Sequence, residues 1–221
     1  MILVGQYDSP FVRRVAVALN SLGLGHEHRP WSTFGDADRL AALNPLRRVP
    51  ALVLDDGEVL IESAAILDHL DETAGEGRLI AASGPARRAM LRVCALATGL
   101  CDKMASLLHE QPLHDEVSEA WVARCSAQIE DVLAALEAAR AGCATRFWFG
   151  ATPGHADIAV ACALRFLAEA HPRLHAPALR PHLAAHAAVC EALPAFASVA
   201  QPFIPPRRAS RRLAPPNAAS A

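Results

Sequence analysis

The stretch Asp8-Ser9-Pro10-Phe11-Val12-Arg13-Arg14-Val15 marks a junction between a strand and a helix. It follows a short apolar run, Ile2-Leu3-Val4, and it opens a segment whose apolar residues recur at helical spacing as far as Leu22. This pattern predicts a strand that leads directly into an amphipathic helix. Ser9 is a favoured N-cap residue, and Pro10 suits the first helical position because its missing N–H has no intrahelical partner there.

The start of this predicted helix suits chemistry on an anion. Unpaired N–H groups and the positive end of the helix dipole stabilise a bound anion at such a position. The chain has no cysteine before Cys94, so we do not expect disulfide exchange by its own thiols at this junction. If sulfur chemistry takes place at this junction, the reacting thiol must belong to a bound ligand.

The composition narrows the class of protein. A chain of 221 residues, 52% hydrophobic and 20% charged, can form one large domain or two small ones with an ample core. A net charge of −2 gives no general attraction to nucleic acid or anionic membranes. No window approaches the roughly 18 uninterrupted apolar residues of a membrane helix, and the N-terminus lacks a signal-peptide pattern. We therefore expect a cytoplasmic protein with no nucleic-acid or membrane partner.

The cysteines are predicted to be reduced helix thiols, most of them buried. All six lie in the Ala/Leu-rich part of the chain from residue 94 onward, and none forms a C-x-x-C pair. A disulfide framework or a zinc site has little support from this spacing, so we expect no metal. They are Cys94, Cys101, Cys125, Cys143, Cys162 and Cys190.

The first part of the chain alternates strand and helix signals. The predicted elements after the first helix are a short strand at 27–29, a short helix at 36–43, two strands at 49–54 and 58–61, and a helix at 63–72. Asp55-Asp56-Gly57 joins the two strands, and its Asp-Gly pair predicts a hairpin with a type I′ turn. This order predicts a small α/β unit with a mixed sheet.

Strand signals vanish after Gly84-Pro85. Long helices are predicted at 86–110, 115–140, 155–170 and 178–192, with a short turn after Pro194. We therefore divide the chain into an α/β domain at 1–75, a linker at 76–85, an all-helical domain at 86–200 and a mobile Pro/Arg-rich tail at 201–221.

The chain resembles the glutathione S-transferase family over nearly its whole length. Ser9-Pro10-Phe11 followed by Arg14-Val15 is similar to the start of serine-type members such as the tau class, and the omega class has cysteine in place of this serine. Three later segments resemble family motifs in the same order. They are Arg48-Val49-Pro50-Ala51-Leu52, Glu62-Ser63-Ala64-Ala65-Ile66, and Trp148-Phe149-Gly150 with Ala156-Asp157-Ile158. The resemblance implies a thioredoxin-like α/β N-terminal domain followed by an all-α C-terminal domain.

The resemblance also implies a glutathione site within residues 1–75. A cis bond at Val49-Pro50 would leave the valine N–H and C=O free to pair with the cysteinyl unit of glutathione. Ser63, at a helix N-terminus, would hold the γ-glutamyl α-carboxylate, and Glu62 would pair with the ammonium group. Arg48 would meet the glycyl carboxylate. Without the resemblance, each residue has a simpler interpretation. Pro50 could be an ordinary turn proline, Ser63 could be a plain N-cap, and Arg48 could be a solvent-exposed charge.

Two hydroxyls compete to activate the glutathione thiol. Ser9 matches the serine-type pattern without a gap, whereas Tyr7 falls where some classes carry a catalytic tyrosine and otherwise suits a packing aromatic. We favour Ser9. Its hydrogen bond and the helix N-terminus would lower the thiol pKa from about 8.5 and favour the thiolate, which attacks an electrophilic carbon.

The family places the electrophile against the helical domain. A small hydrophobic electrophile is therefore the expected second substrate, and a homodimer is the expected assembly. The candidate pocket residues are equally consistent with an ordinary core or helix surface. They are Tyr7, Phe11, Phe34, Leu96, Gly99, Leu100, Lys103 and Met104.

One position departs from the family pattern. The helix predicted at 155–170 usually begins with Ser or Thr three residues before the aspartate, and Gly154 stands there in this chain. Glycine is an acceptable N-cap, and Asp157 can still bond back to the Gly154 amide. We therefore assign Asp157 a role in folding.

Three functions remain open. A glutathione transferase is favoured; a glutathione-dependent isomerase, such as one acting on maleylacetoacetate, and a non-catalytic interaction protein are the alternatives. The isomerases usually begin with a Ser-Ser-Cys pattern, which Asp8-Ser9-Pro10 does not match. Non-catalytic members tend to lose the reactive residue or the Glu-Ser pair, and this chain keeps both Ser9 and Glu62-Ser63.

Overall fold

The computed structural model describes residues 1–75, 79–113 and 116–205. Residues 76–78 of the expected linker and 206–221 of the expected tail lie outside the described residues. Residues 201–205 are described, and they pack against the rest of the chain through hydrogen bonds given below. The boundary of the expected mobile tail at 201 thus falls before five residues that contact the rest of the chain, and the expected mobility itself stays a prediction.

A four-stranded mixed sheet forms the first part of the chain, with strand order β2-β1-β3-β4. Strand β1 (Ile2–Val4) pairs parallel with β2 (Glu27–Arg29) and antiparallel with β3 (Ala51–Val53). Strand β4 (Val59–Ile61) adds an antiparallel edge to β3. The predicted α/β unit with a mixed sheet is confirmed.

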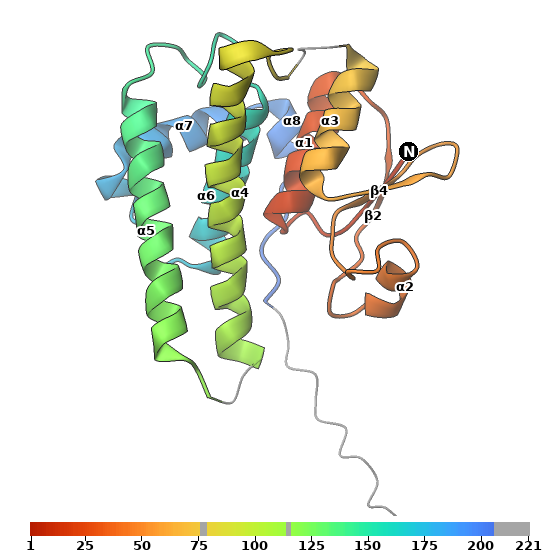
Figure 1. The fold of residues 1–221 in the computed structure, drawn as a ribbon, viewed down its shortest axis with the longest axis horizontal. Coiled ribbons are helices and arrows are strands. Elements are labelled where there is room, and N and C mark those ends of the chain that lie inside the picture. Colours follow the sequence, from red (N-terminus) through yellow and green to blue (C-terminus); the bar gives the residue numbers. More distant parts are fainter. Residues whose placement is uncertain (76–78, 114–115, 206–221) are drawn as a thin grey trace, which may run out of the picture.

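Helices cover both faces of this sheet. Helices α1 (Pro10–Leu22) and α3 (Ser63–Ala74) lie between the sheet and the helices of the second part, and α2 (Ala37–Ala41) lies apart from them (Figure 1). Alternating side chains of the strands divide between the two layers. Leu3 packs with α1 and α3, whereas its neighbour Val4 packs with Leu40 of α2.

The hairpin between β3 and β4 is confirmed, but its predicted type I′ turn is wrong. Gly57 has a positive φ of 93°, and Asp56 does not share this conformation. The Gly57 N–H donates to the Leu54 carbonyl at 3.1 Å, and the Leu54 N–H donates to the Glu58 carbonyl at 2.8 Å. The loop is thus a three-residue connection that ends on a left-handed glycine.

The second part of the described chain is all helical, as predicted. None of its described helices is long and apolar enough to cross a bilayer. Helices α4 and α5 form a long antiparallel pair beside α6 (Figure 1). The elements are α4 (Gly84–Leu113), α5 (Glu119–Ala141), α6 (His155–Ala170), the 3-10 turn η1 (Pro177–Leu179), α7 (Pro181–Glu191) and α8 (Pro194–Ala197).

Helix α7 begins at Pro181 and not at the predicted residue 178, and a tertiary contact completes its first turn. The carboxylate of Glu137 on α5 accepts hydrogen bonds from the N–H groups of His182 at 3.0 Å and Leu183 at 2.8 Å. These are free donors of the first turn, so a side chain distant in sequence takes the place of a local cap.

A close backbone approach explains the glycine at the start of α6. A Cβ atom on Gly154 would lie 2.6 Å from the carbonyl oxygen of Leu79, which accepts the His155 N–H at 2.9 Å. Serine or threonine does not fit there without displacing Leu79. Asp157 accepts the Gly154 N–H at 2.9 Å and the Trp148 N–H at 2.7 Å, so its predicted bond back to the Gly154 amide is confirmed.

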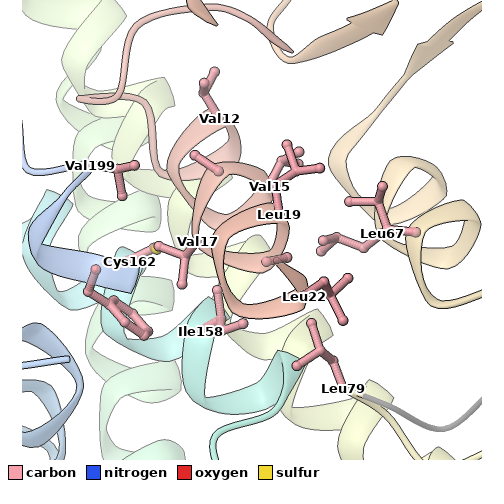
Figure 2. Packing of buried hydrophobic residues seen from close by; sticks show 14 of the residues in the cluster. Val12, Val15, Val17, Leu19, Leu22, Leu67, Leu79, Ile158, Cys162 and Val199 are labelled. Carbon is pink, nitrogen blue, oxygen red and sulfur yellow. The ribbon is translucent and has the colours of Figure 1, made fainter. Parts of the chain in front are cut away.

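Helix α1 is buried on two sides. Its predicted apolar stripe packs toward α3, where Val15, Leu19 and Leu22 approach Leu67 and Leu79 (Figure 2). The opposite side is also buried, and there Val17 points toward Cys162 of α6 (Figure 2). The helix is therefore enclosed along most of its length, which an amphipathic pattern alone does not predict.

A buried charge fastens α1 to the C-terminal helices. The guanidinium of Arg13, 2% exposed, forms a bidentate pair with Glu191 at 2.6 and 2.7 Å. It also donates to the carbonyls of Val199 at 3.3 Å and Phe196 at 3.1 Å. Such a planar, fully partnered pair is stronger than an exposed ion pair.

We predict that Glu191→Gln lowers the free energy of unfolding by about 1.5–3 kcal/mol, because Arg13 then keeps a buried charge without its carboxylate. Urea denaturation measures the loss. Glu27→Gln is the matched control, since Glu27 pairs with Arg29 at 2.7 Å with both side chains largely exposed. Its effect should stay below about 0.5 kcal/mol. Equal effects of the two variants would contradict the prediction.

Candidate functional site

Ser9 occupies the N-cap of α1, as predicted. Its Oγ accepts the Val12 N–H at 3.4 Å, and its carbonyl accepts the Arg13 N–H at 2.9 Å. Among the described residues, no acceptor takes the hydroxyl hydrogen of Ser9. The side chain can therefore cap the helix through its oxygen and donate its hydrogen to an anion at the same time.

Tyr7 lies on the strand side of the same loop. Its ring stacks on His28 with a centroid distance of 3.7 Å, and the His28 Nε2–H donates to the Gly5 carbonyl at 2.7 Å. Partial burial raises the pKa of Tyr7, which makes the phenol a weaker donor to a thiolate. These contacts suit the packing role that the sequence left open for Tyr7.

Gly5 brings the start of α1 against the segment that contains Val49. It has a φ of +129°, and a Cβ atom there would lie 2.5 Å from Val12 Cγ2 and 2.9 Å from Val49 Cβ. Only glycine allows this approach. Sequence reasoning missed Gly5, although a glycine directly after a predicted strand was the available signal.

The predicted cis bond at Val49-Pro50 is confirmed. Among the described residues, neither the N–H nor the carbonyl of Val49 takes part in a hydrogen bond. Because Val49 lies two residues before strand β3, these groups can pair with the backbone of an extended ligand.

Helix α3 begins without a side-chain cap. Glu62 takes the N-cap position with a positive φ of 65°, and Ser63 is the first helical residue. Ser63 is 4% exposed, and its Oγ accepts a hydrogen bond from Arg14 Nη1 at 3.4 Å. The plain N-cap reading of Ser63 is therefore wrong. The uncapped N–H groups of α3 leave a site for an anion beside Ser63.

Arg48 lies between the two parts of the chain. Its guanidinium approaches Glu62 at 3.9 Å and Asp102 of α4 at 3.7 Å, and all three side chains are about half exposed. Both ion pairs are long and solvated, so breaking them costs little free energy. A ligand carboxylate can therefore pair with Arg48 in place of the two acids, and a ligand ammonium group can pair with Glu62 in place of Arg48. Asp102 was not singled out from the sequence, because nothing local distinguishes it from other exposed helix acids.

The structure separates the predicted electrophile-pocket residues. Phe11 is half-buried against the helical core, and Phe34 is exposed with its edge against His109 of α4 at 5.6 Å. Leu100 and Met104 are fully buried in that core. Leu96 also packs against the core, Gly99 is half-buried, and Lys103 lies 5.7 Å from the Trp121 ring. Cavities of about 410 and 150 Å³ lie elsewhere in the helical part.

The C-terminal segment contacts the loop that carries Ser9. Gln201 Oε1 accepts the Tyr7 N–H at 3.0 Å, and Asp8 Oδ2 accepts the Ile204 N–H at 3.0 Å. The Phe203 N–H donates to Glu169 Oε2 at 2.7 Å. This segment thus borders the candidate site, and its low-complexity composition hid the contact from sequence reasoning.

Most of the chain's own thiols are buried in the helical part. All six cysteines are free, as predicted, and five are buried. Burial raises the pKa of Cys162 to about 11 and that of Cys190 to about 12, so both stay protonated at neutral pH. Among the described residues, no group of three His, Cys, Asp or Glu side chains is arranged to hold a metal ion.

Family models match both parts of the chain. The glutathione S-transferase N-terminal domain matches residues 3–78, and the C-terminal domain matches residues 119–188. The maleylacetoacetate isomerase of Pseudomonas aeruginosa is 32% identical over 170 residues, which span 72% of this chain and 77% of that protein.

Comparison with solved structures supports the same family. A glutathione S-transferase from Methylobacterium radiotolerans, in complex with glutathione sulfonate, superposes with a TM-score of 0.85 at 28% identity, covering 92% of this chain and 97% of that one. A bacterial zeta-class maleyl pyruvate isomerase superposes with a TM-score of 0.74 at 27% identity, covering 90% and 96% of the two chains. The chain belongs to the glutathione S-transferase family.

Proposed function

We propose that this protein is a glutathione transferase that binds glutathione as co-substrate and presents its thiolate to a small hydrophobic electrophile. The observation that carries the proposal is the Ser9 hydroxyl at the N-terminus of α1, whose hydrogen no described residue accepts. The backbone of Val49, which also has no partner among the described residues, packs at Gly5 beside Val12 of the same helix. An extended ligand paired with Val49 brings its central residue toward the start of α1. In glutathione that central residue is cysteine.

The binding contacts are assigned on the same basis. Val49, beside the cis Pro50, pairs with the cysteinyl backbone, and Ser63 with the N-terminus of α3 holds the γ-glutamyl α-carboxylate. Glu62 takes the ammonium group and Arg48 the glycyl carboxylate, since each side chain is exposed and only loosely paired. Residues 1–75 would then bind glutathione, and the helical domain at 86–200 would supply the electrophile pocket. We also propose a cytoplasmic location, which provides glutathione.

The chemistry requires only that the thiolate be stabilised. A free thiol is mostly protonated at neutral pH, and the Ser9 hydroxyl donates to the anion without acting as a base. The N-terminus of α1 adds a second favourable interaction with the same charge. The thiolate attacks the electrophilic carbon, a carbon–sulfur bond forms, and the leaving group or the adjacent π-bond takes the electron pair.

Glutathione-dependent cis–trans isomerisation is the second candidate. The similarity to a maleylacetoacetate isomerase and to a maleyl pyruvate isomerase favours it. The same thiolate would add to a conjugated double bond and leave again, so glutathione would be regenerated. The absence of a net loss of glutathione during turnover distinguishes this reaction from conjugation.

Glutathione should raise the melting temperature by several degrees at millimolar concentration, because a ligand selective for the folded state stabilises it by mass action. Differential scanning fluorimetry measures the shift. Cysteinylglycine, which lacks the γ-glutamyl unit, is the control and should shift it much less. No response to glutathione, together with no retention on a glutathione matrix, would support a non-catalytic interaction protein.

Ser9→Ala should lower kcat/KM for conjugation by about ten- to a hundred-fold, because a hydrogen bond to a charged group is worth roughly 1.5–3 kcal/mol. The acidic limb of the pH profile of kcat/KM should move to higher pH as the pKa of the bound thiol rises. Tyr7→Phe should leave that limb in place. A shift in Tyr7→Phe but not in Ser9→Ala would assign activation to the tyrosine.

The matched control for Ser9→Ala is Ser118→Ala, because Ser118 caps α5 with its Oγ accepting the Trp121 N–H at 3.3 Å. Each variant should lose about 1 kcal/mol of stability from its cap. Only Ser9→Ala should move the acidic limb of the pH profile of kcat/KM. The pair therefore separates the loss of a cap from the loss of a thiolate donor.

The protein should form a two-fold dimer that pairs the first domain of one subunit with the helical domain of the other. Leu46 in the first part and Leu91 on α4 are exposed apolar side chains that such an interface would cover. Leu46→Glu should shift the mass measured by light scattering toward the monomer, whereas the control Leu179→Glu should not. A monomeric parent protein at micromolar concentration would contradict the prediction.

A further inference from the structure

A small cavity in the helical part of the chain is lined by basic side chains. Its volume is about 150 Å³, and its lining comes from the end of α5, the loop that follows α5, and α7. None of the lining residues belongs to the candidate site, and among the described residues no acidic side chain lines it. The polar lining consists of Arg140, Cys143, Arg146, His182 and His186.

One guanidinium of this lining is fixed in place and keeps a free nitrogen. Arg140 Nη2 donates to the carbonyls of Thr145 at 3.1 Å and Arg146 at 2.8 Å. Arg140 Nη1 is buried and has no hydrogen-bond partner. A buried donor without an acceptor is costly, so an acceptor supplied by a ligand would stabilise this arrangement.

The second guanidinium is exposed. Arg146 lies with its Cζ 5.3 Å from the centroid of the Phe147 ring. Among the described residues, neither Arg140 nor Arg146 pairs with a carboxylate. Two unpaired guanidiniums at one cavity attract an anion, and their planar forks match the oxygens of a tetrahedral oxyanion.

His186 adds a buried group of the opposite kind. It is 2% exposed, its Nε2 faces Asp157 Oδ1 at 3.7 Å and Cys190 Sγ at 3.6 Å, and its Nδ1 is buried without a partner. Burial lowers the pKa of His186 to about 4, and the positive charge of Arg140 acts in the same direction. The ring is therefore neutral at physiological pH and has one N–H. The carboxylate favours that hydrogen on Nε2, so Nδ1 offers a lone pair.

Neighbouring polar groups do not compete for the cavity. The Cys143 thiol donates to the carbonyls of Ala139 at 3.3 Å and Trp148 at 3.6 Å. The carboxylate of Glu137 caps α7, and that of Asp157 accepts two backbone N–H groups, as described above. Two positively charged donors and one buried acceptor thus remain for a ligand.

We propose that this cavity binds one inorganic phosphate ion as the hydrogen phosphate dianion. Arg140 and Arg146 donate to its charged oxygens, and the phosphate hydroxyl donates to His186 Nδ1. At about 30 Å³ for each water-sized volume, the cavity holds roughly five such volumes, which suits a tetrahedral ion with a water molecule and excludes a nucleotide. This binding is independent of the proposed function.

Calorimetric titration at pH 8 and constant ionic strength tests the ion and its hydroxyl together. Phosphate should bind with a Kd of about 0.1–5 mM. Sulfate and methyl phosphate are also mainly dianions at this pH, but they have no hydroxyl hydrogen to donate. Each should bind about three- to ten-fold more weakly than phosphate.

The location is tested with a pair of variants on α7. Ala185 is exposed and lines the cavity. Ala185→Glu places a carboxylate beside the arginines and should weaken phosphate binding at least about ten-fold. Ala185→Gln has the same size without the charge and should weaken it less than about three-fold. Both variants introduce good helix formers, so folding should be retained.

Thermal stability gives a second readout. Phosphate at ten times its Kd should raise the melting temperature by about 3–5 °C relative to chloride at equal ionic strength. Arg146→Met should remove most of this shift. Arg124→Met is the matched control, because Arg124 is exposed on α5 and does not line the cavity. It should keep the full shift.

The glutathione site is excluded as the source of the signal by two further measurements. Saturating S-methylglutathione should leave phosphate binding unchanged, and so should Arg48→Met. Loss of phosphate binding in either measurement would place the anion in the candidate site and overturn the proposal. Equal binding of phosphate, sulfate and methyl phosphate, or no binding of phosphate, would also overturn it. So would equal effects within the Ala185 pair, or of Arg146→Met and Arg124→Met. None of these outcomes bears on the proposed function, since the phosphate titration needs no glutathione.

Discussion

The enclosure of α1 is the constraint on which the rest of the structure depends. The sheet and α3 cover one side of the helix, and α6 with α8 covers the other (Figure 2). Burial on two sides removes apolar surface from water along most of the helix and joins the two parts of the chain through one shared core. Arg13 strengthens the joint, because its pair with Glu191 needs α1 and α7 in a single relative position.

The candidate site lies at the open end of this enclosed helix. Ser9 is held by the helix it caps, and Val49 approaches Val12 of that helix because Gly5 has no side chain. Ser63 accepts a hydrogen bond from Arg14 of the same helix. Each residue that would contact the proposed ligand is thus held by a helix or by the sheet. Such fixed positions allow a site to stabilise the thiolate charge without rearranging. The C-terminal segment completes the border through Asp8.

Much of this arrangement could be predicted because its signals are local. The helix start at Ser9-Pro10 follows from the need to cap free N–H groups, and the hairpin follows from the turn preference of Asp-Gly. The helices follow from the spacing of apolar side chains over a few residues. The features that could not be predicted are contacts between distant segments. The cap of α7 comes from Glu137 on α5, and the need for glycine at 154 comes from the carbonyl of Leu79. Residues 201–205 are held because their polar groups find partners far away in sequence.

The sequence by itself therefore determined the order of elements, the fold and the identity of the polar groups around the candidate site. Only the tertiary structure decided which charges are buried and what surrounds them. Arg13 and Arg14 are adjacent residues of one type, yet one meets a carboxylate and the other a serine hydroxyl. The difference arises because their side chains leave the helix about 100° apart and enter different neighbouring layers, which no local pattern encodes.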